Sequence, residues 1–178
     1  MQYFIKYLIS LIFAIIIILF IQTFIIKGAV IPNQSMSVTL QKFDRVIINK
    51  TKVTFDMLKR GDIIMYEYEG KIHFSRIIGE PGESVNIKNH HIYIDDRQLK
   101  EKYAQHWQIK DVALRNIKNF DGDMIPPDSF FVLNDNNHDQ SDSRRYGLID
   151  KKSIIGNVSV KYYPFKEFNY QFKKSKEV

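Results

Sequence analysis

The longest uncharged stretch of the chain limits what the chain can fold into. Between Lys6 and Lys27, the sequence from Tyr7 to Ile26 contains no charged residue over twenty positions. As an α-helix rising about 1.5 Å per residue, this run spans roughly 30 Å, the thickness of the hydrocarbon core of a bilayer. Its polar residues are Ser10, Gln22 and Thr23. We therefore expect a transmembrane anchor at residues 7–26, preceded by a short tail at residues 1–6.

Two other interpretations of the apolar run are weaker. A cleaved secretory signal has an apolar region of about 7–15 residues and a small-residue cleavage site, whereas this run is longer and Gly28-Ala29-Val30 matches such a site poorly. A buried core helix has one apolar stripe, but this run is apolar on every face. Lysines flank both ends of the run, so charge alone does not orient it.

After the anchor, the sequence pattern changes to short β-branched segments separated by turn signals. Such a pattern predicts a mostly β fold, an antiparallel barrel or sandwich, with little helix outside the anchor. We expect this β domain to cover residues 27–170 and a basic C-terminal tail to cover 171–178. The stretch from Leu99 to Asp128 is the least regular. The expected strands are Arg45–Asn49, Ile63–Tyr68, Lys71–Ile78, Ser84–Ile87, His91–Ile94, Phe130–Leu133 and Ile154–Tyr163, with a hairpin turn at Asn89–His90.

Composition excludes several classes of site. The chain has no cysteine, which removes disulfides, thiolate nucleophiles and cysteine-based zinc sites. His90 and His91 are adjacent and point to opposite faces of a strand, so we expect no metal site and no cofactor. The net charge is +6, but the basic residues are scattered, with one small cluster at Lys173, Lys174 and Lys176. We expect a solvated basic surface rather than a nucleic-acid site; weak attraction to anionic lipid is the alternative.

Several short motifs occur in order along nearly the whole chain. They are Ser35-Met36 with Thr39-Leu40; Arg45-Val46 with Gly61-Asp62-Ile63-Ile64; Arg76-Ile77-Ile78-Gly79 with Pro81-Gly82; Asp135-Asn136, Asp142-Ser143-Arg144 and Gly147-Leu148-Ile149; and Ile155-Gly156 with Tyr163-Pro164-Phe165. Together these motifs resemble those of the type I signal peptidases. The first, just beyond the anchor, resembles the box that carries the nucleophile of that family.

The resemblance implies a β-rich domain held outside the cytoplasmic membrane by its anchor, in which a serine attacks the peptide bond after a signal sequence and a lysine acts as the base. A serine hydroxyl is a poor nucleophile without a base, and a lysine serves as one only when desolvation lowers its pKa. Ser35 takes the nucleophile position. The lysine should immediately precede Arg76, and the residue there is Ser75.

The same resemblance assigns roles to the neighbouring residues. Asn33 and Met36 are expected at the oxyanion site and in the substrate pocket. The triplet Asp142-Ser143-Arg144 is expected to organise the loop of the site through an ion pair between Asp142 and Arg144; a surface pair worth under about 1 kcal/mol is the alternative.

The loss of the lysine predicts loss of activity. A hydroxyl cannot act as a base near neutral pH, and losing a general base costs about 10²–10⁴-fold in rate. Two histidines are candidate substitutes. His73 lies two residues before the lysine position, about 6–7 Å along the strand, which is too far for a hydrogen bond to the same hydroxyl unless the register shifts; His138 is more weakly placed. Other departures from the family pattern agree with inactivity: Val38 for proline, Asn134 for glycine, Asn137 for arginine and Gln140 for serine.

These observations lead to one main hypothesis and two alternatives. The main one is a membrane-anchored signal peptidase homologue without activity, most similar to the inactive Gram-positive branch of the family. Its expected partners are signal peptides of secretory preproteins, the lipid bilayer and an active signal peptidase, with a single-pass anchor and an extracellular β domain. The alternatives are an active peptidase that uses Ser35 with another base, and a basic tethered module that binds lipid or cell wall.

Overall fold

The structure, a computed structural model, describes residues 2–104 and 107–172. Of the tail expected at 171–178, residues 173–178 lie outside the described residues, and with them the cluster of Lys173, Lys174 and Lys176.

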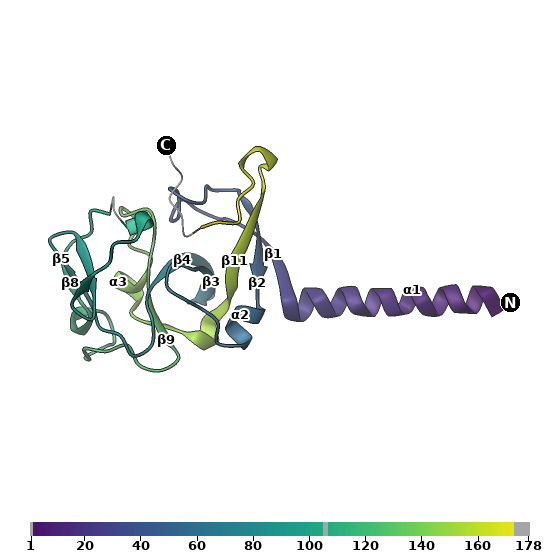
Figure 1. The fold of residues 1–178 in the computed structure, drawn as a ribbon, viewed down its shortest axis with the longest axis horizontal. Helices are drawn as coiled ribbons and strands as arrows, with labels where there is room; N and C mark the ends of the chain where they lie inside the picture. The colour runs from purple at the N-terminus through teal and green to yellow at the C-terminus, as the bar shows by residue number, and fades with distance from the viewer. Residues whose placement is uncertain (1, 105–106, 173–178) are drawn as a thin grey trace.

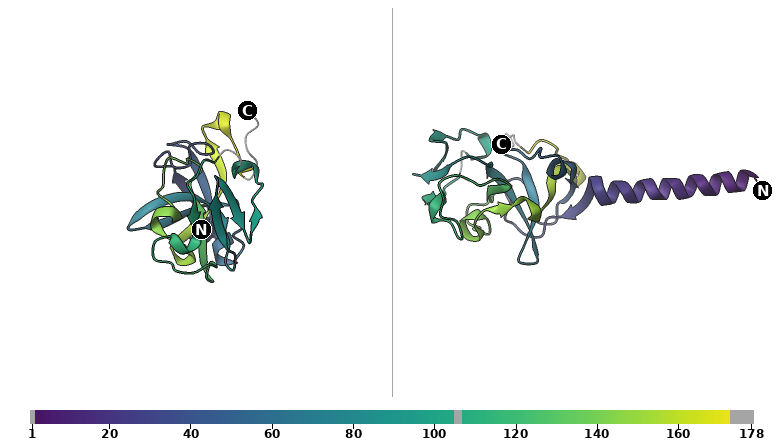
Figure 2. Two further views of the ribbon diagram at one scale, coloured as in Figure 1. Left: turned by 90° about the vertical axis from the view of Figure 1, so that its left-hand side faces the viewer. Right: turned by 90° about the horizontal axis from the view of Figure 1, so that it is seen from below.

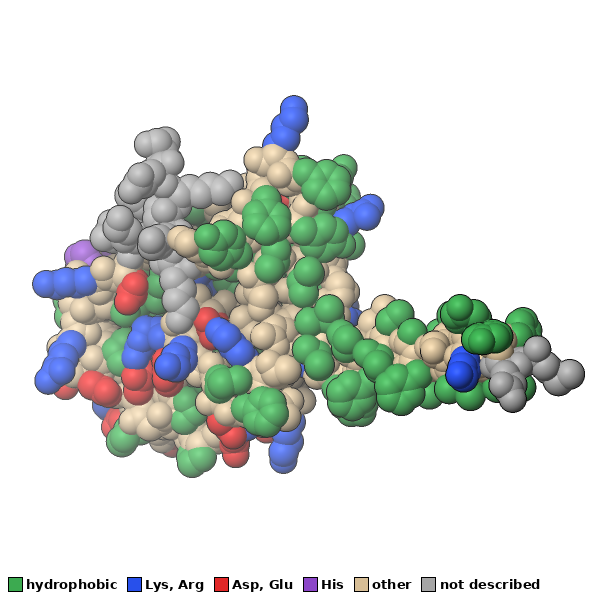
Figure 3. Space-filling view, turned by 45° about the vertical axis from the view of Figure 1, so that its right-hand side comes forward, with side chains coloured by type: hydrophobic (Ala, Val, Ile, Leu, Met, Phe, Trp, Pro, Cys, Tyr) green, Lys and Arg blue, Asp and Glu red, His purple; other side chains and the backbone are tan. Residues whose placement is uncertain are grey.

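One long helix projects from a β-rich body (Figure 1, Figure 2). Helix α1 (Gln2–Phe20) continues through one π-helical turn, η1 (Ile21–Ile25), directly into strand β1 (Ile26–Val30). The stretch Tyr3–Ile25 is long and apolar enough to cross a membrane, and none of its most apolar window is buried in the protein. Hydrophobic side chains cover the projecting helix in the space-filling view (Figure 3). The helix begins inside the expected tail, and Ile26 already belongs to a strand.

All strand pairs are antiparallel and form two sheets. The larger sheet has the order β1-β2-β11-β3-β4-β9-β10, and the smaller has the order β7-β6-β5-β8. The smaller sheet lies at the end of the body far from the helix (Figure 1). The bounds are β2 (Arg45–Asn49), β3 (Ile63–Tyr68), β4 (Lys71–Gly79), β5 (Val85–Lys88), β6 (His91–Ile94), β7 (Arg97–Gln98), β8 (Val112–Ala113), β9 (Ser129–Leu133), β10 (Ile149–Asp150) and β11 (Ile154–Tyr163).

Helical segments outside the anchor are short. They are the α-helical turns α2 (Thr51–Thr54) and α3 (Ser143–Tyr146) and the 3₁₀ turns η2 (Lys102–Ala104), η3 (Leu114–Asn116), η4 (Lys151–Ser153) and η5 (Phe165–Glu167). The stretch from Leu99 to Asp128 holds two of these turns and the two-residue strand β8, so it is irregular as expected.

The prediction of a mostly β, antiparallel fold with one N-terminal apolar helix is confirmed. Every expected strand is present within one or two residues of its predicted bounds. Asn89 and His90 form the expected hairpin turn with positive φ angles of 50° and 64°, the geometry of a two-residue turn that follows the strand twist. The barrel alternative is not observed: within the described residues the large sheet stays open, with β1 and β10 at its ends.

Strand β4 positions the site because both of its faces are buried. Phe74 packs into one core cluster, with Met36 and Leu40 from the loop after the anchor. Ile77 packs into a second cluster on the other face, together with Tyr66 of β3. Residues of one strand that alternate between two packed faces have little freedom to shift register. The segment 73–77 is therefore a fixed frame for the loops that meet at it.

Candidate functional site

The loop that carries Ser35 is held at both ends and anchored in its middle. The Ile31 N–H donates to Asp44 O at 2.9 Å, and the Phe43 N–H donates to Ile31 O at 2.9 Å. Between these ends, Met36 and Leu40 are fully buried. The Asn136 N–H also donates to Ser35 O at 2.9 Å, which ties this loop to the segment after β9.

Ser35 is buried, and its hydroxyl faces two acceptors. Ser35 Oγ donates to Asn33 Oδ1 at 2.8 Å and lies 3.5 Å from Phe74 O. The Ser35 N–H also points to Asn33 Oδ1, at 3.1 Å. Amide and peptide oxygens accept hydrogen bonds but are not bases near neutral pH. Asn33 therefore acts toward Ser35 as an acceptor and not as the donor that an oxyanion site needs.

Ser75 follows Phe74 on β4, whose carbonyl oxygen lies 3.5 Å from Ser35 Oγ, but the Ser75 hydroxyl makes its hydrogen bonds to other residues. Its side chain is fully buried. Ser75 Oγ donates to Asn134 Oδ1 at 2.6 Å and lies 3.2 Å from the Tyr66 hydroxyl. The register explains this pairing: Arg76 is opposite Leu133 on β9, so the next position along each strand brings Ser75 to Asn134. The position of the family's lysine is thus part of a closed polar network.

Asn134 links this network to the following loop. Its N–H donates to Asp142 Oδ2 at 2.8 Å, and its Nδ2 donates to Asp139 O at 3.3 Å. Burial raises the pKa of Tyr66, so its hydroxyl stays neutral. Among the described residues, Ser75 and its two hydrogen-bond partners, Tyr66 and Asn134, therefore bring only hydroxyl and amide groups to the base position, and none of these three side chains can accept a proton from Ser35 at neutral pH.

Neither His73 nor His138 is hydrogen-bonded to Ser35. The His73 ring stacks on Tyr66 with centroids 5.6 Å apart and meets the Tyr146 ring edge-on at 5.2 Å. Burial lowers the pKa of His73. His138 is exposed, and its N–H donates to Asn136 Oδ1 at 3.2 Å. Among the described residues, the partners of Ser35 Oγ are Asn33 and Phe74 alone.

The ion pair between Asp142 and Arg144 is buried, with side-chain exposures of 0% and 7%. It is bidentate: Arg144 Nε donates to Asp142 Oδ1 at 2.8 Å, and Nη2 donates to Oδ2 at 2.6 Å. Arg144 also donates to Asp139 O at 2.7 Å and Asn137 O at 3.3 Å, and Ser143 Oγ accepts from the Val132 N–H at 2.9 Å. These contacts favour a loop-organising role over the exposed surface pair.

A second buried ion pair was not foreseen from the sequence. Arg76 Nε donates to Asp135 Oδ1 at 2.8 Å, and Nη2 donates to Oδ2 at 2.6 Å. Both side chains are almost fully buried, and Thr39 Oγ1 donates to Asp135 Oδ2 at 2.5 Å. The pair joins β4, the segment after β9 and the Ser35 loop. Both residues stand in family motifs, but motif membership alone does not say that they touch.

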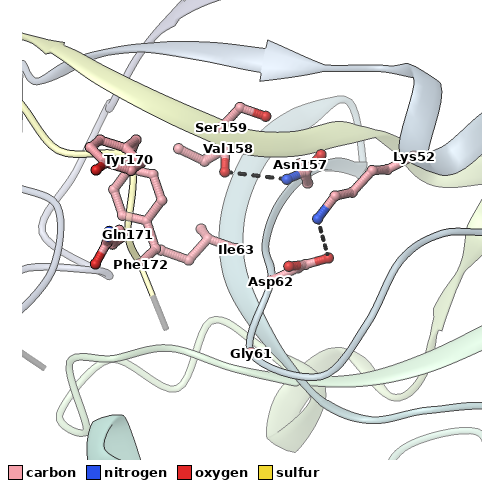
Figure 4. Close-up of a pocket in the computed structure, with 10 residues that line it drawn as sticks. All are labelled: Lys52, Gly61, Asp62, Ile63, Asn157, Val158, Ser159, Tyr170, Gln171 and Phe172. Atoms are coloured by element: carbon pink, nitrogen blue, oxygen red, sulfur yellow. Dashed lines mark hydrogen bonds and ion pairs between the residues drawn. The ribbon is translucent and has the colours of Figure 1, made fainter. Parts of the chain in front are cut away.

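A separate pocket of about 430 Å³ lies between the start of β3, the middle of β11 and residues 170–172 (Figure 4). The ion pair of Lys52 and Asp62, 3.0 Å long, is on one side, and the rings of Tyr170 and Phe172 are on the other. None of the predicted site residues lines it, so it is not part of the Ser35 site. Over residues 2–104 and 107–172, no group of three or more His, Asp or Glu side chains is arranged to hold a metal ion.

Known proteins resemble this chain over most of its length. The family described as "Signal peptidase, peptidase S26" matches residues 4–163. A protein of Staphylococcus aureus (strain Mu50) named "Inactive signal peptidase IA" is 57% identical over 169 residues, which cover 95% of this chain and 97% of that protein. "Signal peptidase IB" of Staphylococcus aureus (strain MRSA252) is 30% identical over 181 residues, covering 94% of this chain and 93% of that protein.

A solved structure agrees with these matches. The crystal structure of a signal peptidase I from Enterococcus faecalis is 28% identical and superimposes with a TM-score of 0.52, covering 56% of this chain and 95% of that chain. The family predicted from the ordered motifs is confirmed: the chain belongs to the signal peptidase family, peptidase S26.

Proposed function

We propose that this protein is a membrane-anchored signal peptidase homologue that binds signal peptides of secretory preproteins without cleaving them. The observation that carries the proposal is the environment of the Ser35 hydroxyl. Its partners, Asn33 Oδ1 and Phe74 O, are acceptors without basicity, and the family's base position holds Ser75, whose hydroxyl is committed to Asn134. The high similarity to a protein named "Inactive signal peptidase IA" supports the same proposal.

The chemistry explains why Ser35 alone is not enough. To attack a peptide carbonyl carbon, the serine oxygen must lose its proton as the new C–O bond forms, and the leaving amine must gain one. In this family a lysine carries that proton between the two steps. Without such a group the rate falls by about 10²–10⁴-fold or more, because nucleophile and base act as a unit.

The loops around Ser35 are nevertheless tied together, which supports the proposal that a peptide-binding shape is kept. The Ser35 loop, β4 and the segment after β9 are joined by the buried ion pair of Arg76 and Asp135 and by the hydrogen bond between Asn136 and Ser35. Met36 is a fully buried wall of this frame. Loss of the base removes catalysis without removing the shape, so binding is the activity that can remain.

The anchor supports a specific location. We infer that helix α1 crosses the cytoplasmic membrane once and that the β domain lies on its extracellular side, where signal peptides emerge. An active signal peptidase in the same membrane is a further proposed partner. The chain contains no cysteine, so a single introduced one can be labelled selectively in intact cells. A membrane-impermeant maleimide should label Lys88→Cys, an exposed position on β5, in intact cells; labelling only after the cells are lysed would contradict the orientation.

Two measurements test the activity and the binding separately. Purified full-length protein in detergent, and its Ser35→Ala variant, should both give negligible cleavage of a secretory preprotein. Cleavage by the natural protein alone would favour the alternative, an active peptidase with another base, and mutation of His73 and His138 would follow.

Failure of the soluble domain to bind anionic vesicles in a salt-sensitive manner would argue against the other alternative, a lipid-binding module.

Binding is tested with peptides instead of protein variants, so that folding is not in question. A photo-crosslinkable signal peptide with small residues at its cleavage motif should crosslink to the full-length protein. The same peptide with bulky residues at those positions should bind about tenfold more weakly, since a pocket that fits a small side chain rejects a large one by about 1–3 kcal/mol. Equal crosslinking of both peptides would overturn the binding proposal.

A further inference from the structure

A pocket of about 250 Å³ lies at the turn of the β3–β4 hairpin, and Ser35 and Ser75 do not line it. Three aromatic rings form much of its wall. The Tyr68 and Tyr146 rings stack with centroids 4.2 Å apart, and the His73 ring meets both edge-on, at 6.5 Å and 5.2 Å. The pocket is below the usual range of about 300–1,000 Å³ for ligand sites, so a ligand must be compact.

The fold brings these residues together from three separate segments. Tyr68 is opposite Lys71 in the register of β3 and β4, so both side chains share the face that also carries His73. Arg145 and Tyr146 come from α3. The backbone carbonyl oxygen of Lys118 lies next to Gly147, at the end of α3. It is so close that a Cβ added to Gly147 would collide with it. The pocket therefore has a fixed backbone on all three sides.

The charges around the pocket are unbalanced. Lys71, Lys118 and Arg145 line it, against one carboxylate, Glu69, which leaves a formal excess of two positive charges. Over residues 2–104 and 107–172, none of these three cations takes part in an ion pair. All three cations are exposed, so water screens their mutual repulsion, but an anion placed in the pocket would still meet a net positive charge.

His73 adds a polar group that is also unused. Its ring is half-buried, and in the described part of the chain neither ring nitrogen has a hydrogen-bond partner. Burial lowers its pKa, so at neutral pH the imidazole offers one donor and one acceptor at the pocket wall. Its stacking on Tyr66, at 5.6 Å, fixes the plane of the ring.

We propose that this pocket binds a small soluble phosphate ester that carries a flat ring. The phosphoryl group would lie among Lys71, Lys118 and Arg145, whose excess charge matches a dianion. The ring would lie against the Tyr68 and Tyr146 side chains, since aromatic faces favour stacked or edge-on rings. This inference is independent of signal-peptide binding at the Ser35 site.

The test is calorimetric titration of the full-length protein in uncharged detergent with phenyl phosphate, inorganic phosphate and benzyl alcohol. Phenyl phosphate should bind, and inorganic phosphate should bind about fivefold more weakly, because ring stacking adds roughly 1 kcal/mol. Lys71→Ala and Arg145→Ala should each raise the Kd for phenyl phosphate about tenfold through the loss of one charge-assisted hydrogen bond.

Lys88→Ala is the matched control, since it removes one exposed lysine from β5, outside the pocket. It should leave the Kd within about twofold, which is the small effect expected of a distant screened charge. An absence of phenyl phosphate binding, or an equal loss in Lys88→Ala, would overturn the site. Equal affinities for phenyl phosphate and inorganic phosphate would overturn the ring-binding part, and tighter binding of benzyl alcohol than of inorganic phosphate would overturn the role of charge.

Discussion

At position 75, the buried serine hydroxyl has hydrogen-bond partners in its surroundings. Ser75 Oγ donates to Asn134 Oδ1 and faces the Tyr66 hydroxyl, so each polar atom of this buried group has a partner. A lysine introduced here would meet the same neighbours. Hydrogen bonding to its ammonium would favour the charged form and oppose the effect of desolvation on its pKa. Replacing one residue is therefore only part of what rebuilding the base requires.

We predict that Ser75→Lys gains measurable, Ser35-dependent cleavage and that Ser75→Lys with Asn134→Gly gains more. Asn134→Gly removes the oxygen that would hold the ammonium charged; each unit by which the lysine pKa falls toward neutrality raises the fraction of free amine about tenfold. The assay is cleavage of a preprotein in detergent. Asn134→Gly alone should stay inactive, and a double variant no faster than the single one would contradict the role given to Asn134.

A second residue-scale prediction concerns alkaline pH. Burial raises the pKa of Tyr66 above its ordinary value, so the folded state holds this proton where the unfolded chain releases it. The stability that this provides is complete below about pH 10, the unfolded value, and is lost as pH rises beyond it, by up to about 1.4 kcal/mol per pH unit.

Thermal unfolding midpoints between pH 8 and 11 check this expectation. Tyr66→Phe should flatten the alkaline decline, while Tyr93→Phe, which changes a half-buried tyrosine of β6, should not. Burial also raises the pKa of Tyr103, so some decline should persist in Tyr66→Phe. Parallel curves for the natural protein and Tyr66→Phe would exclude Tyr66 as a source.

The residues of the site differ in how far the sequence could predict them. Ser35 and Ser75 could be assigned from motifs, since local sequence patterns carry their positions. The partners of Ser75 could not, because Tyr66 is nine residues away on β3 and Asn134 lies beyond β9; only the strand register brings them together. The pair of Arg76 and Asp135 escaped for the same reason, because charges far apart in sequence reveal no contact.

At the scale of elements, β11 depends on one close approach of two backbones. A Cβ at Gly156 would lie 2.5 Å from Asn49 O and 2.6 Å from Ile48 Cγ2, both on β2. The register of β11 against β3 also shifts between Ile154 and Gly156. Glycine at such a point lets two strands pack where any side chain would separate them.

Gly156→Ala should therefore lower the free energy of unfolding by about 1–3 kcal/mol through overpacking. Gly28→Ala is the matched control: it is also in a strand of the same sheet, but an added Cβ has nothing within 4 Å. It should change the free energy of unfolding by less than about 0.5 kcal/mol. Chemical unfolding of the full-length protein measures both, and similar effects at the two positions would contradict the packing argument.

The elements themselves were largely predictable, because alternation of apolar residues and turn signals act locally. Strand β1 was missed: Ile26–Val30 is exposed along most of its length, and its pairing with β2 leaves no apolar pattern in the sequence. The two-residue strands β7, β8 and β10 carry too few residues for a period. The open form of the large sheet depends on which edges meet, and no local pattern encodes that.

At the scale of the whole molecule, the anchor and the sheet are joined without a loop. The π-helical turn η1 runs directly into β1, the Lys50 N–H donates to Ile25 O at 2.9 Å, and Lys50 Nζ donates to Thr23 O at 2.6 Å. Strand β2 is thus hydrogen-bonded both to β1 and, through the residue that follows it, to the end of the helix. This joint sets the distance, along the helix axis, between the end of the helix and the Ser35 loop.

An insertion at the joint should separate the two parts. Six Gly and Ser residues between Ile25 and Ile26, where η1 meets β1, form a flexible link of roughly 13 Å. The variant should keep its crosslinking to a soluble signal peptide but lose most of its crosslinking to one embedded in a bilayer, which must be met at a fixed height. The same insertion at the exposed turn Asp95–Asp96 is the control. Equal crosslinking of the bilayer-embedded peptide in both variants would contradict a fixed height.

A joint without a loop also transmits rotation. If a neighbouring protein in the membrane grips one side of helix α1 and turns it about its axis, β1 and β2 must turn with it, and the Ser35 loop sweeps through the same angle. A partner could therefore aim this protein toward or away from an emerging polypeptide without touching the β domain. The helix would then set the rotational orientation of the β domain and would not only hold it at the membrane.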